Sequence, residues 1–489
     1  MRSGEDDTSF DQNRCGRYSD FGFILPDRLP KTWHPQALSG RPLRTRPGCP
    51  PLRRRNRARL SRASLNAPAE AGDHIGSANI ASGYLCHMQH RHWLYLIAWV
   101  CTASSGIAAT LFSVYLPSIA KDFAGSVPVK DFIPTFGSAC GGSFLIGWAV
   151  GAFVLGSLAD RIGRRTALFL CVLLSTVGMT VTGLISDFTI LVAVRFATGF
   201  GAGSVLALST VLVSEAFHSG RRAVLVGILI NAFPVGFIIA GMVASSQSDW
   251  RVAFSLTTFT LVLPLLILLV VRESDMWQAR ADHHRTSSLA HLLSTAHRKD
   301  LFVGVTLFGS MLVGLWAVFA WMPTWVHHMS DAAAAQQNRA LTNIMLGGGS
   351  VAGGLVSGLL SERFGRRVAS AFAYLGCIGT TLLIFQSGQQ PGSLLFVCTF
   401  ILSTFIGINQ GVLSTYIPEL FPTRLRGSAT GVSMNAGRFL TAITVFFVGV
   451  LVPMLGGYEN AISIFAVAYG VGLIVLMWAR ETHGAPLPE

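Results

Sequence analysis

Long apolar segments alternate with short polar segments along most of this 489-residue chain. Each apolar segment has at least about 18 residues, which is enough for a helix to cross a bilayer. The apolar positions show no alternation of period two, so the pattern predicts helices rather than strands of a membrane barrel. We therefore expect an all-α membrane protein. The twelve predicted spans lie near residues 93–118, 132–157, 166–186, 189–214, 223–246, 251–271, 301–326, 340–360, 368–386, 392–416, 428–452 and 459–479.

The composition agrees with a membrane protein. Hydrophobic residues make up 51% of the chain and charged residues 12%, whereas charged residues make up about 25% of an ordinary soluble domain. The net charge of +13 does not indicate nucleic-acid binding, because the charges lie in a terminal segment and in short loops. We expect the lipid bilayer and a small-molecule substrate as partners, and no nucleic acid.

The basic residues between the spans alternate by side. Seventeen Lys and Arg residues fall on one side of the predicted bilayer and four on the other, and an excess of this kind marks the cytoplasmic side. Both termini are therefore predicted to be cytoplasmic in a multi-pass protein of the plasma (inner) membrane. The sparse side holds Lys121, Lys130, Arg251 and Arg339, each expected in a connecting loop.

Residues 1–87 differ from the rest of the chain. They contain fourteen Lys and Arg, eight Asp and Glu, and the run "PPLRRRNRAR" at 50–59. The segment lacks the apolar core of a secretory signal peptide and sustains no helix or strand period. We interpret it as a disordered basic tail. Translation from Met88 is the main alternative, and the scattered acids disfavour a third, an organellar presequence.

A short charged turn occurs twice. "GSLADRIGRR" at 156–165 lies between predicted spans two and three, and "GLLSERFGRR" lies between spans eight and nine, 202 positions later. A second pair, "EAFHSGRR" at 215–222 and "ELFPTRLR", is offset by 204. The repeats predict two pseudo-symmetric six-helix bundles at 88–271 and 300–480. A cytoplasmic linker at 272–299 would join the bundles, and a tail at 481–489 would follow them.

These motifs resemble the signatures of the major facilitator superfamily of transporters. The repeated turn is similar to the loop signature between spans two and three, and "RFATGFGAG" at 195–203 is similar to a span-four signature. "PELFPTRLRGSATGVSMNAGR" at 418–438 resembles the subgroup of sugar porters and metabolite or aromatic-acid:proton symporters. The resemblance implies the major facilitator fold and a secondary active transporter that works by alternating access. We expect a monomer.

The repeated charges are interpreted as a conformational latch. Glycines allow tight turns, and acids at the membrane surface can pair with arginines or with a helix N-terminus. Such bridges would hold the two halves closed at the cytoplasmic face, whereas the alternative is that basic loops only orient the helices. The candidate latch residues are Gly156, Asp160, Arg161, Gly163, Arg164, Arg165, Glu215, Arg222, Glu362, Arg363, Gly365, Arg366, Arg367, Glu419, Arg424 and Arg426, with the acid–arginine pairs Glu215/Arg222 and Glu419/Arg426 among them.

Glycines are concentrated in the fourth and eighth predicted spans. A nucleotide-binding glycine loop needs a preceding strand, and only helix is predicted here. Close helix–helix packing is therefore the preferred interpretation. The residues are Gly199, Gly201, Gly203, Gly347, Gly348, Gly349, Gly353, Gly354 and Gly358.

Two charges lie deep inside predicted spans, Arg195 in the fourth and Arg438 in the eleventh. A charge at the bilayer centre costs roughly 2.5–3.5 kcal/mol on insertion scales, so each guanidinium needs a partner. The aromatic-acid subgroup that the chain resembles carries Asp-Gly-x-Asp in span one, but residues 105–108 read "SGIA". Because no other carboxylate lies deep in a span, an anionic substrate is the natural partner of a guanidinium.

Five uncharged residues at similar depth are expected to complete a substrate site at the membrane midplane. Three are amides, Asn231, Gln410 and Asn435, and two are aromatic, Trp316 and Trp321. Structural roles are the alternatives. Arg195 would then bind backbone carbonyls of span one, Arg438 would be structural as well, and the amides would form helix–helix hydrogen bonds.

The sequence thus predicts a secondary transporter of a small organic anion. A multidrug or sugar carrier of the same fold is one alternative, and a non-transporting membrane sensor is another. The spans hold no Walker motif, no HExxH and no Ser/His/Asp set, and the eight cysteines are scattered. We therefore expect no enzyme activity, no cofactor, no metal site and no disulfide framework. Coupling to a proton stays open, since span one lacks a carboxylate to carry it.

The charge asymmetry predicts the topology. Reporter fusions after Asp122 and after Glu459 should be external, and a fusion after Arg285 should be cytoplasmic. The measurement is the activity of a compartment-specific reporter in whole cells. An external position after Arg285 would contradict the predicted orientation.

Overall fold

The computed structural model describes the backbone of residues 73–484 except 218, 275–276, 279–296, 388–389 and 423–424, and most side chains from His90 onward. Within these residues the chain is mainly helical and has no strand. Twelve helical segments are long and apolar enough to cross a membrane. The prediction of an all-α protein with twelve transmembrane helices is confirmed. Residues 1–72, most of the predicted tail, lie outside the described part.

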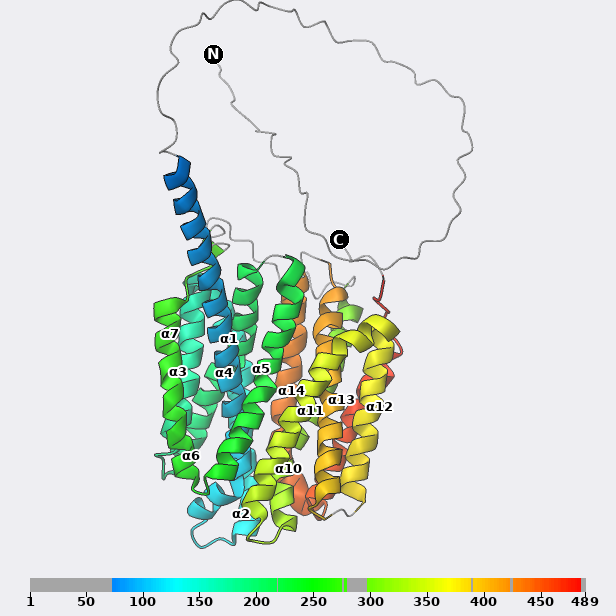
Figure 1. Ribbon diagram of the computed structural model, residues 1–489. Helices are drawn as coiled ribbons and strands as arrows, with labels where there is room; N and C mark the ends of the chain where they lie inside the picture. Colours follow the sequence, from blue (N-terminus) through cyan, green and yellow to red (C-terminus); the bar gives the residue numbers. More distant parts are fainter. Residues whose placement is uncertain are drawn as a thin grey trace, which may run out of the picture. The chain divides into compact units, whose positions relative to one another are not determined.

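The first half of the chain supplies six spans (Figure 1). Five are single helices, whereas the sixth is built from two short α-helices with a 3-10 turn between them. The elements are α1 (Asp73–Phe123), α2 (Val129–Ile162), α3 (Arg164–Thr182), α4 (Phe188–Ala216), α5 (Ser219–Ser246), α6 (Trp250–Leu256), η1 (Thr257–Leu261) and α7 (Val262–Val270). Helix α1 begins within the segment 1–87, upstream of the first predicted span.

The second half supplies the other six spans, again with the last one divided. Its elements are α10 (Arg298–Met329), α11 (Ala335–Phe364), α12 (Arg366–Gln386), α13 (Ser393–Glu419), α14 (Arg426–Met454), α15 (Tyr458–Ile464) and α16 (Ala466–Leu476). Several helices exceed the roughly 20 residues that cross a bilayer; α2 has 34. Their ends therefore project beyond the apolar layer, where the connecting loops begin.

Two equivalent turns define one end of the bundle. Gly163 joins α2 to α3 with φ 97°, and Gly365 joins α11 to α12 with φ 86°. A side chain strains a backbone with positive φ, so glycine is the residue suited to both turns. We call this the basic end, because arginines follow each turn. The other end, where α1 finishes at Phe123 and α11 begins at Ala335, is the opposite end.

Helices α2 and α4 approach each other through reciprocal glycine contacts. A Cβ at Gly199 of α4 would lie 1.9 Å from the carbonyl oxygen of Phe144 in α2. A Cβ at Gly151 of α2 would lie 2.0 Å from the carbonyl oxygen of Phe200 in α4. Backbone therefore packs directly against backbone, which is how small residues hold membrane helices together.

The second half repeats this contact between the corresponding helices, α11 and α13. A Cβ at Gly353 would lie 2.0 Å from the carbonyl oxygen of Thr404, and one at Gly407 would lie 2.4 Å from that of Ser350. The predicted packing role of the glycines is confirmed for these spans, although Gly358 has open space around it. Each half thus holds its own helices by backbone contact.

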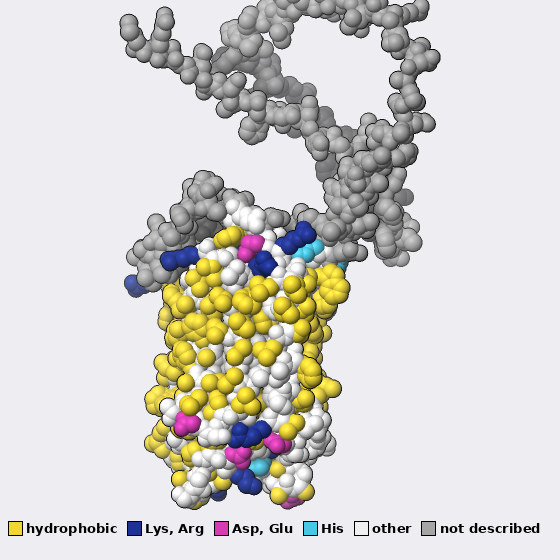
Figure 2. Space-filling view, turned by 90° about the vertical axis from the view of Figure 1, so that its left-hand side faces the viewer, with side chains coloured by type: hydrophobic (Ala, Val, Ile, Leu, Met, Phe, Trp, Pro, Cys, Tyr) yellow, Lys and Arg dark blue, Asp and Glu magenta, His cyan; other side chains and the backbone are white. Residues whose placement is uncertain are grey.

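The outer surface is apolar between the two ends. Figure 2 shows hydrophobic side chains over the middle of one face and charged side chains toward its two ends. Large exposed apolar residues such as Phe259, Leu269 and Leu359 lie on spans of both halves. This distribution fits a protein surrounded by hydrocarbon, with its charges in the interfacial layers.

The two halves meet along a seam formed by α2 with α14 and by α5 with α11. The hydrogen bonds that cross the seam lie toward the opposite end. One joins the Gly449 N–H to Ser138 Oγ at 2.8 Å, and another joins Asn343 Nδ2 to the Phe237 carbonyl at 2.8 Å. The seam is therefore fastened at the opposite end, which is one of the two states that alternating access requires.

The reciprocal contacts predict opposite effects for two glycine-to-alanine changes. Gly199→Ala would place a methyl group against the backbone of α2 and should cost about 1–3 kcal/mol of stability, as overpacking does. Gly379→Ala, in an open position of α12, should leave stability unchanged or raise it by about 0.5–1 kcal/mol. Thermal unfolding of the purified chain in detergent measures both. Equal melting temperatures for the two variants would contradict the packing.

Candidate functional site

Arg195 is fully buried between α4, α1 and α2. Its side chain is 2% exposed, and the centre of the guanidinium lies 4.6 Å from the Phe112 ring and 4.4 Å from the Phe144 ring. Its Nη1 also donates to the carbonyl of Ala108 in α1 at 3.5 Å. Two ring faces and one carbonyl compensate part of the cost of burying the charge. Arg195 therefore binds a span-one carbonyl, as the structural alternative predicts.

Arg195 also lines a small cavity with the two predicted tryptophans. The cavity has a volume of about 30 Å³ and includes Trp316 and Trp321 of α10, which is room for one or two water molecules. Trp321 Nε1 is buried there without a hydrogen-bond partner. A cation, several aromatic rings and a tryptophan with an unpaired N–H donor thus surround this cavity.

Two of the predicted amides line a second small cavity. Asn231 of α5 and Gln410 of α13 share it with Phe237 and Phe319, and its volume is also about 30 Å³. The Nδ2 of Asn231 donates to the carbonyl of Gly227 at 3.0 Å, within the same helix. The two amides therefore line the same cavity from the two sides of the seam.

A cluster of aromatic rings lies beside both cavities. The Trp148 ring makes edge contacts with Phe233, at a centroid distance of 5.5 Å, and with Trp316, at 5.8 Å. Phe233 lines the second cavity and Trp316 lines the first. In this conformation the seven predicted residues consequently form separate groups rather than one pocket.

Arg438 is half-buried in the middle of α14. Its Nη1 donates to Asn435 Oδ1 at 2.7 Å, one helical turn earlier. Among the described residues no carboxylate forms an ion pair with it. A guanidinium has five N–H donors, so one amide oxygen leaves most of them available.

Arg339 is a third buried guanidinium, and sequence analysis placed it wrongly. It was expected in a loop, but it lies inside α11 and is 3% exposed. The helix begins five residues before the predicted span at 340–360, because the polar stretch "QQNRALTN" at 336–343 continues the helix instead of ending it. The spacing of its polar residues at three and four positions was the signal for one buried helical face.

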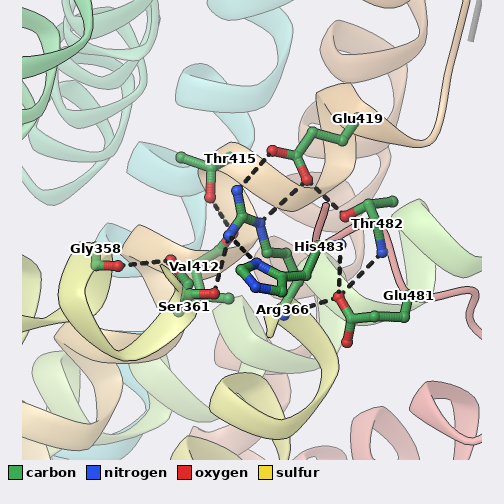
Figure 3. Close-up of polar contacts among 9 residues, drawn as sticks. All are labelled: Gly358, Ser361, Arg366, Val412, Thr415, Glu419, Glu481, Thr482 and His483. Carbon is green, nitrogen blue, oxygen red and sulfur yellow. Dashed lines mark hydrogen bonds and ion pairs between the residues drawn. The ribbon is translucent and has the colours of Figure 1, made fainter. Parts of the chain in front are cut away.

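Two latch residues of the second half, Arg366 and Glu419, lie in one connected cluster of polar contacts (Figure 3). Arg366 donates to both oxygens of Glu419, through Nε at 3.2 Å and Nη2 at 3.1 Å, in the two-pronged geometry that guanidinium and carboxylate favour. Its Nη1 donates to the carbonyl of Ser361 at 2.9 Å. Thr482 donates to Glu419 Oε2 at 2.5 Å. The carboxylate is therefore held from two separate segments.

Glu481 completes this cluster at the N-terminus of α12. It accepts from the backbone N–H of Arg366 at 2.9 Å and of Arg367 at 3.0 Å, groups that have no partner within their own helix. Burial raises the pKa of Glu481, but the N–H groups of Arg367, His483, Arg366 and Thr482 outweigh it and lower the pKa below its usual value. The carboxylate thus stays charged and caps the helix.

The first half repeats the arrangement with a looser centre. Arg164 Nη1 lies 2.8 Å from Asp160 Oδ1, and its Nε lies 3.9 Å from Glu215 Oε1. Glu273 accepts from the backbone N–H of Arg164 at 2.7 Å and of Arg165 at 3.2 Å, so it caps α3. The second oxygen of Glu215 is buried without a hydrogen-bond partner.

Each half therefore joins its two repeated motifs to each other. The expected pairs Glu215/Arg222 and Glu419/Arg426 do not form. Arg222 is exposed, and Arg426 donates to the carbonyl of Pro418 at 3.0 Å, because the turn arginine of each half already faces the acid. Of the other candidates, Arg161, Glu362 and Arg363 are exposed, Gly156 has open space around it, and Arg424 lies outside the described residues.

The two capping acids were missed by sequence analysis. Glu273 and Glu481 follow the sixth and twelfth spans, within "RES" at 272–274 and "RET" at 480–482. This third repeat, offset by 208, was the available signal. The ion pairs of each cluster join residues of the same half. A latch between the two halves therefore stays a prediction for another conformation.

Comparison with known proteins agrees with the fold. Residues 98–446 and 341–488 match the Major Facilitator Superfamily, and this chain belongs to that family. It is a secondary transporter of a small organic solute that spans the membrane many times.

Similar proteins include two bacterial transporters and one solved structure. A "Probable 4-methylmuconolactone transporter" of Cupriavidus pinatubonensis is 27% identical over 79% of this chain and 90% of its own length. The "Cis,cis-muconate transport protein" of Acinetobacter baylyi is 26% identical over 80% and 95%. The crystal structure of a D-xylose-proton symporter has a TM-score of 0.66 at 17% identity, over 81% of this chain and 98% of that one; this likeness concerns the fold alone.

The geometry of the two clusters predicts unequal costs for removing an acid. Glu419→Gln breaks a partly buried two-pronged contact and should cost about 1.5–3 kcal/mol. Asp160 is 73% exposed, so Asp160→Asn should cost about 0–1 kcal/mol and yet reduce transport sharply if the latch acts during the cycle. Melting temperature and uptake in proteoliposomes measure the two effects. Wild-type transport by Asp160→Asn would contradict the latch.

Proposed function

We propose that this chain carries a small organic anion by alternating access and that Arg438 holds the carboxylate of the substrate. The observation that carries the proposal is its position in the middle of a membrane-spanning helix with one amide oxygen as its hydrogen-bond partner. An uncompensated charge at this depth is costly. A substrate carboxylate would remove that cost with two charge-assisted hydrogen bonds.

Asn435 would position Arg438 in this site. Its Oδ1 accepts from Nη1 at 2.7 Å, which fixes one edge of the guanidinium and leaves the other edge free. Two parallel N–H groups on one edge match the two oxygens of a carboxylate. Asn435 would therefore contribute orientation rather than charge.

Arg195 would act on the substrate at a distance. Its guanidinium is enclosed by Phe112 and Phe144, so direct contact with a solute requires these rings to move. Its charge nevertheless favours an anion in the cavity shared with Trp316 and Trp321. Flat, conjugated substrates fit such a wall, because aromatic faces pack against one another at short distance.

The name of one relative supports the choice of ligand. The Acinetobacter protein is named for muconate, an organic anion. A sugar is the second candidate, favoured by the cavity that Asn231 and Gln410 share, since amides bind hydroxyl groups without needing a charge. The described lining of that cavity contains no charged side chain. This distinguishes it, as a site for a neutral sugar, from the arginine site proposed for an anion.

We place the basic end and both termini in the cytoplasm, with the linker 272–299 between the two bundles. The excess of arginine at that end supports the orientation. In the state with the basic end closed, the clusters around Arg164 and Arg366 would meet their counterparts in the other half. The two bacterial relatives support a location in the inner membrane.

Substitution of Arg438 tests the proposal. Loss of a charge-assisted hydrogen bond costs about 1.5–3 kcal/mol, which is about ten- to a hundredfold in affinity. Arg438→Gln should reduce proteoliposome uptake of carboxylates by this factor or abolish it. Arg438→Lys should rescue it poorly, because an ammonium lacks the planar fork.

Arg298→Gln is the matched control, because it removes the same charge from an exposed position and should leave uptake unchanged. A panel of carboxylates, neutral sugars and organic cations identifies the substrate class. Normal carboxylate uptake by Arg438→Gln would contradict the anion site. A neutral sugar carried equally well by wild type and Arg438→Gln would favour the second candidate.

A further inference from the structure

A stripe of three polar residues on α11 crosses the seam near the opposite end. Gln336, Arg339 and Asn343 recur at intervals of three and four residues, so they share one helical face. Gln336 Nε2 donates to the Ala244 carbonyl of α5 at 2.9 Å. Arg339 Nη2 donates to Ser118 Oγ of α1 at 3.2 Å. We call these three residues the seam stripe.

Arg339 is the charged member of the seam stripe and is poorly satisfied. Its Nη2 also contacts Gln336 Oε1, but its Nε and Nη1 are buried without a hydrogen-bond partner. Among the described residues it forms no ion pair. Asp122, one turn beyond Ser118, is engaged instead by Trp250 Nε1 at 2.9 Å. Buried donors of a charged group are costly to leave unpaired.

Other polar groups beside Arg339 do not neutralise it. Tyr115 of α1 and His327 of α10 lie within electrostatic range of the guanidinium. The Tyr115 hydroxyl donates to the Gln247 carbonyl at 2.6 Å, and His327 Nδ1 is buried without a partner. The seam thus encloses a positive charge together with unused hydrogen-bonding groups and no described carboxylate partner.

Depth distinguishes Arg339 from Arg438. It lies four residues after Ala335, about 6 Å along the helix from the opposite end. Arg438 lies sixteen residues before the end of α14 at Met454, about 24 Å along its helix. When the halves separate at the opposite end, Arg339 is therefore exposed to an arriving solute before Arg438 is reached.

We propose that Arg339 is an anion-binding residue of the seam, which exchanges its bond to Ser118 for the carboxylate of an organic anion when the halves separate. The ligand class rests on the proposed function, whereas the site itself is separate from Arg438. When Nη2 leaves Ser118, it forms one edge of the guanidinium together with Nε, which is unpaired in the closed seam, and the carboxylate takes this edge. The same guanidinium fastens the seam again once the anion has moved on.

This exchange predicts effects of opposite sign for two residues in contact. Ser118 competes with the anion for the guanidinium, so Ser118→Ala should strengthen anion binding several-fold. Arg339→Gln removes the anion's partner and should weaken binding about ten- to a hundredfold. A purely structural bond between the two side chains would instead give effects of the same sign.

The experiment measures benzoate binding by calorimetry to the full chain in nanodiscs, with benzamide as the uncharged control. Measurements in the Arg438→Gln background isolate the second site, and Arg339→Gln and Ser118→Ala are added singly. Asn343→Ala is the matched variant, because it removes an uncharged bond of the seam stripe and should leave benzoate affinity unchanged or raise it. Benzamide binding should not respond to Arg339→Gln.

Two results would overturn the proposal: benzoate affinity that is the same with and without Arg339→Gln, or a loss of affinity in Ser118→Ala. Failure of the Arg438 site gives a different result, in which Arg438→Gln binds and transports benzoate like wild type. The Arg339 comparison is then decided in the wild-type background. If Arg339→Gln does not fold, Arg339→Lys and Ser118→Ala still give the sign of the effect.

Discussion

The burial of guanidinium groups without carboxylates is the constraint on which this protein's inner organisation depends. A membrane interior offers no bulk water, so each charge must be satisfied by the protein or by a ligand. Arg195 contacts two ring faces and a carbonyl, although its Nε is buried without a hydrogen-bond partner. Arg339 uses hydroxyl and amide oxygens at the seam, and Arg438 has one amide oxygen. None of the three forms an ion pair among the described residues, so each carries a positive charge that an anion could compensate.

Rigidity and movement are assigned to different kinds of contact. Within each half, glycine contacts such as Gly199 on Phe144 and Gly353 on Thr404 bring backbone against backbone, and such contacts cannot slide without a clash. Across the seam, side-chain hydrogen bonds such as that of Asn343 to Phe237 can break and re-form at modest net cost. Two stiff bundles joined by exchangeable bonds are suited to rocking about a central site.

The sequence predicts the helices of this fold better than it predicts the contacts between their side chains. Spans, halves and glycine packing follow from hydropathy and internal repetition, which are local properties. The pairing of Arg366 with Glu419 was missed because each half has two acids and several arginines in its repeated motifs, and the sequence does not show which arginine faces which acid. The turn at Gly365 determines this in the structure. Arg339 was misplaced for a related reason. A polar stretch at the boundary of a span predicts a loop unless the neighbouring helices that bury it are known.

The two halves differ at the basic end, and the difference lies in the hydrogen bonds of one hydroxyl group in each half. In the second half Thr482 donates to Glu419, and both oxygens of that acid also accept from Arg366. In the first half the corresponding Ser274 Oγ accepts from the Trp277 N–H at 3.3 Å, so it is turned toward its own segment and leaves Glu215 with one unpaired oxygen. An acid already saturated with donors gains little from a new partner, whereas an acid with a buried, unpaired oxygen gains a charge-assisted bond. In this conformation the first-half cluster thus keeps an unpaired acceptor that the acid of the second-half cluster does not have, although both halves repeat the same turn.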